Sequence, residues 1–157
     1  MEINPNILEV ADIYQKKYGT SDYFKKLQIA QMVHESGNGT SPLAVEDNNF
    51  GGLTGYHKSA GAQPDGDGEY GHFDTLEEYA TYLHDGFFAH YSNIHNATSV
   101  EEYASILKDN GYYTDSLENY ASSMAQIAGE EYVAGAHVGR HYAGFAGLEK
   151  GVGPQIY

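Results

Sequence analysis

The segment QMVHESGNGTSP, residues 31–42, changes character at Glu35. Before this residue, Met32 and Val33 continue an apolar run with helical spacing, whereas small and polar residues follow it. A carboxylate at the inner edge of a core is costly unless it is paired, hydrogen-bonded or functional. The sequence therefore predicts a special role for Glu35 at the end of a helix, and the rest of the chain has to indicate which role.

Two helices are expected before this point. Asn4 and Pro5 are typical of a helix start, and Gly19 is a stop signal, which together predict a helix over 5–18. Ser21 or Asp22 caps a second helix that reaches about residue 35. The residues expected to be buried along these helices are Ile7, Leu8, Ala11, Tyr14, Tyr18, Phe24, Leu27, Ala30 and Val33.

Three capping boxes predict three further helices. They begin at Thr75, Ser99 and Asp115, each with Glu three residues later, and the last two helices stop near residues 110 and 128. Residues 37–74 are expected to form loops and short extended pieces, with a small hairpin in AQPDGDGEYGHF, residues 62–73. We expect one domain over 1–157, with its core at about 21–128 and a glycine-rich, irregular tail over 129–157 that packs on its side.

The composition excludes several classes of protein. The net charge of −14 disfavours binding to nucleic acid and to anionic lipid. With no cysteine, neither disulfides nor a zinc–thiolate site is possible. No apolar run approaches the roughly 20 residues of a membrane span, and no signal peptide is visible at the N-terminus. The 15 tyrosines and 6 phenylalanines suit half-exposed grooves as well as cores.

Three motifs occur in a recognisable order. HESGNGTSPLAVEDNNFGG (34–52) contains Glu-Ser-Gly-x-Gly, Ser-Pro-Leu-Ala and Asn-Asn-Phe-Gly. HFDTLEEYATYL (72–83) and NGYYTD (110–115) follow it. Together these segments resemble glycoside hydrolase family 73, the peptidoglycan-cleaving β-N-acetylglucosaminidases, over about residues 21–128. One departure is Asn38, which stands where the family often has Trp.

The resemblance implies an α+β, mainly α fold: a lysozyme-like helical lobe, a small β-hairpin lobe and a groove between them. It also implies hydrolysis of the β-1,4 bond of GlcNAc–MurNAc glycan strands, with Glu35 as the general acid and Tyr112 lining the groove near the cleaved bond. The other candidate substrate-binding residues are Asn48, Asn49, Phe50, Tyr56 and Tyr113.

Glycoside hydrolysis usually needs a second group beside the acid. In PDGDGEY, residues 64–70, Glu69 fits the family's second acid best, and Asp65 and Asp67 are the alternatives. The 2-acetamido group of the substrate or a held water could serve instead. We expect no metal and no cofactor, because this acidic turn lacks EF-hand spacing. His137 and His141 have helical spacing, but the glycines around them disfavour a helix.

The sequence is also compatible with other functions. A muramidase or lytic transglycosylase could use the same fold to cut the other glycan linkage. A non-catalytic module that binds glycan, for example on a phage particle, is a further alternative. The expected partner is bacterial peptidoglycan, outside the cytoplasm, with other virion or tail proteins as possible neighbours. The protein is then either virion-associated or a trimmed domain of a secreted autolysin.

Overall fold

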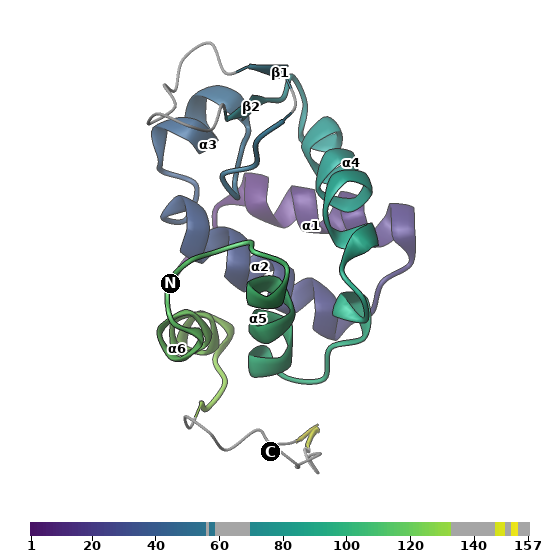
Figure 1. Cartoon of the computed structure of the whole chain (residues 1–157), viewed down its shortest axis with the longest axis vertical. Coiled ribbons are helices and arrows are strands. Elements are labelled where there is room, and N and C mark those ends of the chain that lie inside the picture. Colours follow the sequence, from purple (N-terminus) through teal and green to yellow (C-terminus); the bar gives the residue numbers. More distant parts are fainter. Residues whose placement is uncertain (56, 59–69, 133–146, 150–151, 154–157) are drawn as a thin grey trace. The chain divides into compact units, whose positions relative to one another are not determined.

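The computed structural model describes residues 1–55, 57–58, 70–132, 147–149 and 152–153, with no side chains for 57–58 and beyond 132 (Figure 1). Contacts within the chain divide it into two compact units, Met1–Ala97 and Thr98–Tyr157. The first unit holds α1 (Pro5–Tyr18), α2 (Asp22–Ser36), α3 (Pro42–Asp47), β1 (His57–Lys58), β2 (Gly71–His72), α4 (Leu76–Gly86) and two 3-10 turns, η1 (Phe88–His90) and η2 (Ile94–Asn96). The second holds α5 (Val100–Asp109), α6 (Leu117–Ala128), β3 (Gly147–Glu149) and β4 (Val152–Gly153).

The expected mainly helical class is confirmed, with six helices in the described residues. The predicted caps hold for most of them: the Asn4, Ser21, Thr75 and Ser99 side chains each accept a hydrogen bond from a backbone N–H in the first turn. The last helix starts one position later than predicted. Its cap is Ser116 rather than Asp115, because the Ser116 hydroxyl is the group that accepts from the Asn119 N–H.

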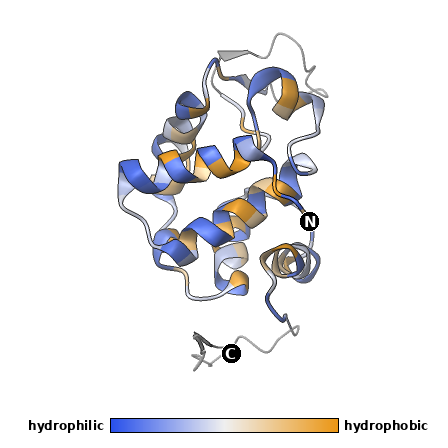
Figure 2. Cartoon of the chain, turned by 180° about the vertical axis from the view of Figure 1, so that it is seen from behind, coloured by the Kyte–Doolittle hydropathy of each residue, from blue (hydrophilic) through white to orange (hydrophobic). Residues whose placement is uncertain are grey.

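In the first unit, α1 packs against both α2 and α4. The predicted stripe of α2 is buried along its whole length. For α1 the prediction was wrong at Leu8, which is 44% exposed, because Val10 takes the buried position instead. Figure 2 shows hydrophobic and hydrophilic residues sharing the surface of the same helices, as expected for amphipathic elements that bury only one face.

The short helix α3 contradicts the expectation of loops over residues 37–74. Ser41 and Pro42 explain it: the serine hydroxyl accepts from the Ala44 N–H, and proline occupies the first helical position. The helix ends at Asn48, which adopts the left-handed conformation. This geometry makes α3 a rigid connector between the Glu35 region and the next segment.

Strand content is small in the part of the chain that the structure describes. β1 and β2 pair antiparallel, His57 opposite His72 and Lys58 opposite Gly71, and an isolated bridge joins Thr54 and Tyr70. No β-hairpin lobe of the expected size is seen among these residues. Its expected turn falls on residues 59–69, which lie outside the described part.

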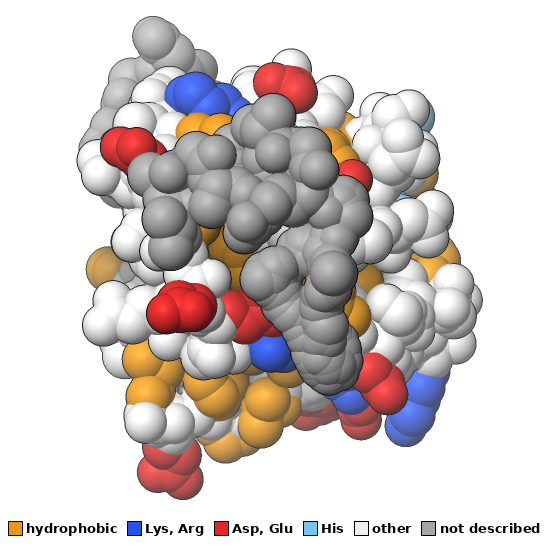
Figure 3. Space-filling view, turned by 90° about the horizontal axis from the view of Figure 1, so that it is seen from below, with side chains coloured by type: hydrophobic (Ala, Val, Ile, Leu, Met, Phe, Trp, Pro, Cys, Tyr) orange, Lys and Arg blue, Asp and Glu red, His pale blue; other side chains and the backbone are white. Residues whose placement is uncertain are grey.

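The second unit is built on the pairing of α5 with α6. Its buried side chains include large aromatic and aliphatic groups from both helices, namely Tyr103, Leu107, Tyr120 and Met124. A second antiparallel pair joins β3 and β4. Across the helices described in both units, none combines the length and the apolarity that crossing a bilayer requires. Acidic side chains are scattered over the face drawn in Figure 3 rather than gathered in one patch.

Candidate active site

Glu35 lies in the last turn of α2, one residue before the helix ends. Its side chain is partly buried, and the preceding Met32 and Val33 are 2% and 4% exposed. Gly37 caps the helix in the left-handed conformation, with φ of 59°, where a side chain would cost energy. The helix thus fixes the backbone of Glu35, and the chain reverses directly after it.

Ser36 holds this helix end together. Its hydroxyl donates to the carbonyl oxygen of Met32 at 2.6 Å and accepts from the Gly39 N–H at 2.8 Å. Its carbonyl oxygen accepts from the N–H groups of Thr40 and Ser41 at 3.1 and 3.0 Å. The side chain is almost completely buried, so these bonds lie away from water, where leaving them unmade would be costly. The serine of Glu-Ser-Gly therefore orders the backbone on which Glu35 stands.

Tyr79, in α4, lies close to Glu35. Burial raises the pKa of Tyr79 well above its ordinary value, and the negative charge of Glu35 raises it further. The tyrosine ring is wedged edge-to-face between Phe50 and Phe73, at centroid distances of 5.6 and 5.3 Å. The Tyr79 phenol therefore stays uncharged in an aromatic setting, near enough to Glu35 for the charge of that residue to raise its pKa, and this relation was not predicted from the sequence.

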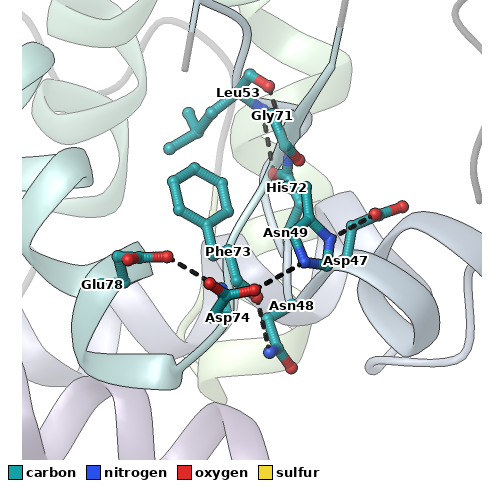
Figure 4. A network of polar contacts seen from close by, with 9 residues as sticks. All are labelled: Asp47, Asn48, Asn49, Leu53, Gly71, His72, Phe73, Asp74 and Glu78. Atoms are coloured by element: carbon teal, nitrogen blue, oxygen red, sulfur yellow. Dashed lines mark hydrogen bonds and ion pairs between the residues drawn. The ribbon is translucent and has the colours of Figure 1, made fainter. Parts of the chain in front are cut away.

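Asn49 is buried and makes several hydrogen bonds within the fold. Its amide nitrogen donates to the carbonyl oxygens of Leu53 and Gly71, both at 3.0 Å. Its amide oxygen accepts from the Leu53 N–H at 3.0 Å and from the Gly51 N–H at 3.4 Å. With 1% exposure and these four bonds, the Asn49 side chain is occupied by the fold itself, as Figure 4 shows in part.

The neighbouring residues of this motif are also tied to the fold. The Asn48 amide donates to the carbonyl oxygen of Phe73 at 2.8 Å, which joins the end of α3 to the residue after β2. Phe50 is 1% exposed and packs against Tyr79. This placement favours a supporting function for Asn48, Asn49 and Phe50 beneath a substrate site. Their part in substrate binding stays a prediction.

A second polar link joins α3 to β2 through His72. Its Nδ1 lies 2.7 Å from a carboxylate oxygen of the buried Asp47, and its Nε2 lies 3.0 Å from Asp74 (Figure 4). The hydrogen bond to Asp47 raises the pKa of His72, burial opposes this effect, and Asp74 reinforces it. Neither Asp47 nor His72 was predicted as important, because no local sequence pattern joins two residues 25 positions apart.

The second unit contains the predicted tyrosine pair. The ring of Tyr113 stacks on the buried Tyr120 at 3.7 Å, with the Lys108 ammonium group 5.2 Å from its centre. The Tyr113 hydroxyl donates to the carbonyl oxygen of Ala104 at 2.9 Å. Packing and hydrogen bonding thus occupy Tyr113. Both Tyr112 and Tyr113 are partly buried, and their contact with a sugar stays a prediction.

Several candidates lie outside the described residues. These are Tyr56, the three acidic candidates Asp65, Asp67 and Glu69, and both His137 and His141. Within the part that the structure describes, no three His, Asp or Glu side chains are grouped as a metal site requires. Among the described carboxyl groups, Glu35 is the one that the motif predicts as the acid, and its place at the ordered end of α2 suits proton transfer to a bound substrate.

Comparisons with known proteins agree with this chemistry. A family model described as mannosyl-glycoprotein endo-β-N-acetylglucosaminidase matches residues 10–142. A solved structure described as a type VI secretion system effector–immunity complex from Pseudomonas protegens has a similar fold. The TM-score is 0.56 at 18% sequence identity, and the match covers 80% of this chain and 94% of the other. No curated protein sequence matches the chain significantly.

Proposed function

Because the chain belongs to the glucosaminidase family, we propose that it hydrolyses the β-1,4 glycosidic bond of peptidoglycan glycan strands, with Glu35 as the general acid. The observation that carries this proposal is the place of Glu35 at the end of α2, where Ser36 orders the backbone. The order of the Glu-Ser-Gly, Asn-Asn-Phe-Gly and Gly-Tyr-x-Thr-Asp motifs supports peptidoglycan as the substrate.

In the proposed reaction, the Glu35 carboxyl group donates its proton to the glycosidic oxygen while the bond from the anomeric carbon to that oxygen breaks. Water then adds to the anomeric carbon, and the proton that it releases restores the acid. A general acid has to remain protonated until it acts, which apolar surroundings favour. Met32, Val33 and Tyr79 provide such surroundings.

We propose Glu69 as the second carboxylate, which either attacks the anomeric carbon or activates the water. Asp65 and Asp67 are the alternatives within the same acidic turn, and the 2-acetamido group of the substrate or a held water could replace all three. Tyr112 and Tyr56 are proposed to contact the sugar. Because peptidoglycan lies outside the cytoplasmic membrane, the proposed site of action is the cell wall. The descriptions of the matched family and of the similar structure name no phage protein.

The test uses the purified protein on bacterial sacculi. We expect new reducing ends to appear, with GlcNAc as the reducing-end sugar of the fragments in mass spectrometry. MurNAc at that position would instead identify a muramidase or a lytic transglycosylase. A high-mannose glycoprotein is the parallel substrate, since the family description names mannosyl-glycoproteins. Cleavage of that glycoprotein alone would overturn the choice of peptidoglycan.

The assignment of Glu35 has its own control. Glu35→Gln keeps the size of the side chain but removes the transferable proton, so we expect hydrolysis to be lost while the far-ultraviolet circular dichroism stays unchanged. Glu46→Gln makes the same change in charge at an exposed position of α3. The Glu46→Gln protein is expected to be as active as the wild type. Equal lysis by the Glu35→Gln protein would refute the proposal, as would tight glycan binding by the wild type without turnover.

A further inference from the structure

The turn that follows Glu35 has an unusual backbone. Gly37, Asn38 and Gly39 adopt φ angles of 59°, 57° and 80° in succession. The left-handed region costs energy for a residue with a side chain, although Asn tolerates it better than most. A run of three such residues persists when the surrounding structure holds it in place. Because Asn38 is the only one of the three with a side chain, we expect its contacts to stabilise the turn.

That support comes from the first residues of the chain. The Asn38 amide oxygen accepts from the Asn4 N–H at 3.0 Å, and its amide nitrogen donates to the Glu2 carbonyl oxygen at 2.8 Å. In return, the Asn4 amide nitrogen donates to the Asn38 carbonyl oxygen at 3.2 Å. These three hydrogen bonds join segments that are 34 or more residues apart in the sequence.

The contact is also tight. A Cβ atom at position 39 would lie 2.4 Å from the Asn4 amide nitrogen, so the chain accepts only glycine there without a shift. Asn4 has a second task, because its side-chain oxygen accepts from the Asn6 N–H and caps α1. The Asn4 side chain thus holds both the start of α1 and the turn that follows Glu35.

The turn transmits this contact to the end of α2. The Asn38 N–H donates to the carbonyl oxygen of Val33 at 2.9 Å, and the Gly39 N–H donates to the Ser36 hydroxyl at 2.8 Å. Val33 and Ser36 flank Glu35 in the same helical turn. A displacement of Asn38 or Gly39 therefore changes the hydrogen bonds on both sides of the carboxyl-bearing residue.

We propose that Asn38 and Asn4 form a clasp that positions Glu35 for proton transfer, a role that rests on the proposed function. Neither residue is taken to touch the substrate; both act through the turn and are positioning residues. The clasp also accounts for Asn38 at a position where the resembling family often has Trp. In this chain, the residue after Glu-Ser-Gly is used to bind the N-terminal segment.

Two substitutions isolate the clasp. Asn38→Gly removes both side-chain hydrogen bonds but tolerates a φ of 57° without strain. Asn4→Asp keeps the oxygen that caps α1 and removes the amide donor to Asn38. Asn6→Ala is the matched control, because Asn6 is exposed in the first turn of α1 and uses only its backbone N–H in the cap.

We expect Asn38→Gly to lower kcat on peptidoglycan about tenfold while KM changes by less than about twofold, since small misplacements of a catalytic group reduce the chemical step. The Asn4→Asp protein should show a smaller loss of kcat. The double variant should lose less than the product of the two single losses, because the three hydrogen bonds hold one contact. Hydrogen exchange at the Gly39 amide should accelerate in both variants. Asn6→Ala should match the wild type in each measurement.

Wild-type kcat in a folded Asn38→Gly protein would overturn the clasp. A double variant whose loss of kcat equals the product of the two single losses would also overturn it. If Asn38→Gly does not fold, Asn38→Asp replaces it, since Asp keeps the acceptor for the Asn4 N–H. Its kcat should then fall only in part, and an unchanged kcat would again overturn the clasp. An inactive wild-type protein refutes the proposed function instead. Wild-type kcat in the Asn38→Gly protein beside an inactive Glu35→Gln protein refutes the clasp alone.

Discussion

Replacing Glu101 by Gln removes a buried ionisable group from the α5–α6 unit. The Glu101 side chain is 4% exposed, and burial raises its pKa from 4.5 to about 7, with the charge of Glu118 adding to the effect. Between these two values the unfolded chain releases the proton while the folded chain retains it. The free energy of unfolding of the wild type therefore falls as the pH rises from about 4.5 to about 7.

The size of this effect follows from the shift in pKa. At about 1.4 kcal/mol for each pKa unit, ionising Glu101 in the folded state costs about 3 kcal/mol at pH 8. Relaxation and water penetration reduce such penalties, so we expect about 2 kcal/mol in practice. Glu101→Gln removes the penalty. The variant should be more stable than the wild type by about 2 kcal/mol at pH 8 and by less than about 1 kcal/mol at pH 5.

Urea denaturation of both proteins at pH 5 and pH 8 measures this difference. Glu46→Gln is the control, because it makes the same change in charge at an exposed site. Its stability relative to the wild type should be nearly the same at the two pH values. A Glu101→Gln protein whose advantage does not grow with pH would show that Glu101 ionises normally in the folded state, and the reasoning from burial would be refuted.

Three further predictions concern the first unit and the tyrosine pair. Asn49→Ala should lower the free energy of unfolding by about 3 kcal/mol in urea denaturation, because it removes several buried hydrogen bonds. Tyr112→Ala should lower kcat/KM about tenfold with little change in stability, whereas Tyr113→Ala should mainly lower the unfolding midpoint, because it removes a stacked ring. For His72→Gln, the loss of stability should be greatest below pH 6.5 and should shrink as the pH rises through the raised pKa of His72 in the folded protein. Asp47→Asn should weaken that pH dependence without abolishing it, because Asp74 also raises the pKa of His72; denaturation at several pH values would reveal the change.

Local patterns in the sequence were enough to predict five of the six helices in the described residues. Caps such as Ser99 and stop signals such as Gly19 act within one turn, so a short stretch of sequence contains them. The helix α3 was missed because its six residues are too short to show a period, although Ser41 and Pro42 were its signal. Leu8 was misplaced since helical spacing alone does not decide which of two adjacent stripes meets the core.

The candidate site was predictable only in part. Glu35 and Ser36 are adjacent in a motif, and the resemblance drew attention to them. The contacts of Asn38 with Asn4 and of His72 with Asp47 join residues that are 34 and 25 positions apart, and no local pattern encodes them. Tyr113 was predicted as a sugar contact from its place in NGYYTD, and this stays a prediction; its stacking on Tyr120 is visible only in three dimensions.

The stem at residues 53–55 and 70–71 depends on one side chain. The Thr54–Tyr70 bridge and the bond from the Gly71 N–H to the Leu53 carbonyl oxygen at 2.8 Å join its two sides. The Asn49 amide nitrogen donates to the carbonyl oxygens of both Leu53 and Gly71. Loss of this one amide therefore releases both sides of the stem at once, so a single substitution can loosen two segments that are far apart in the sequence.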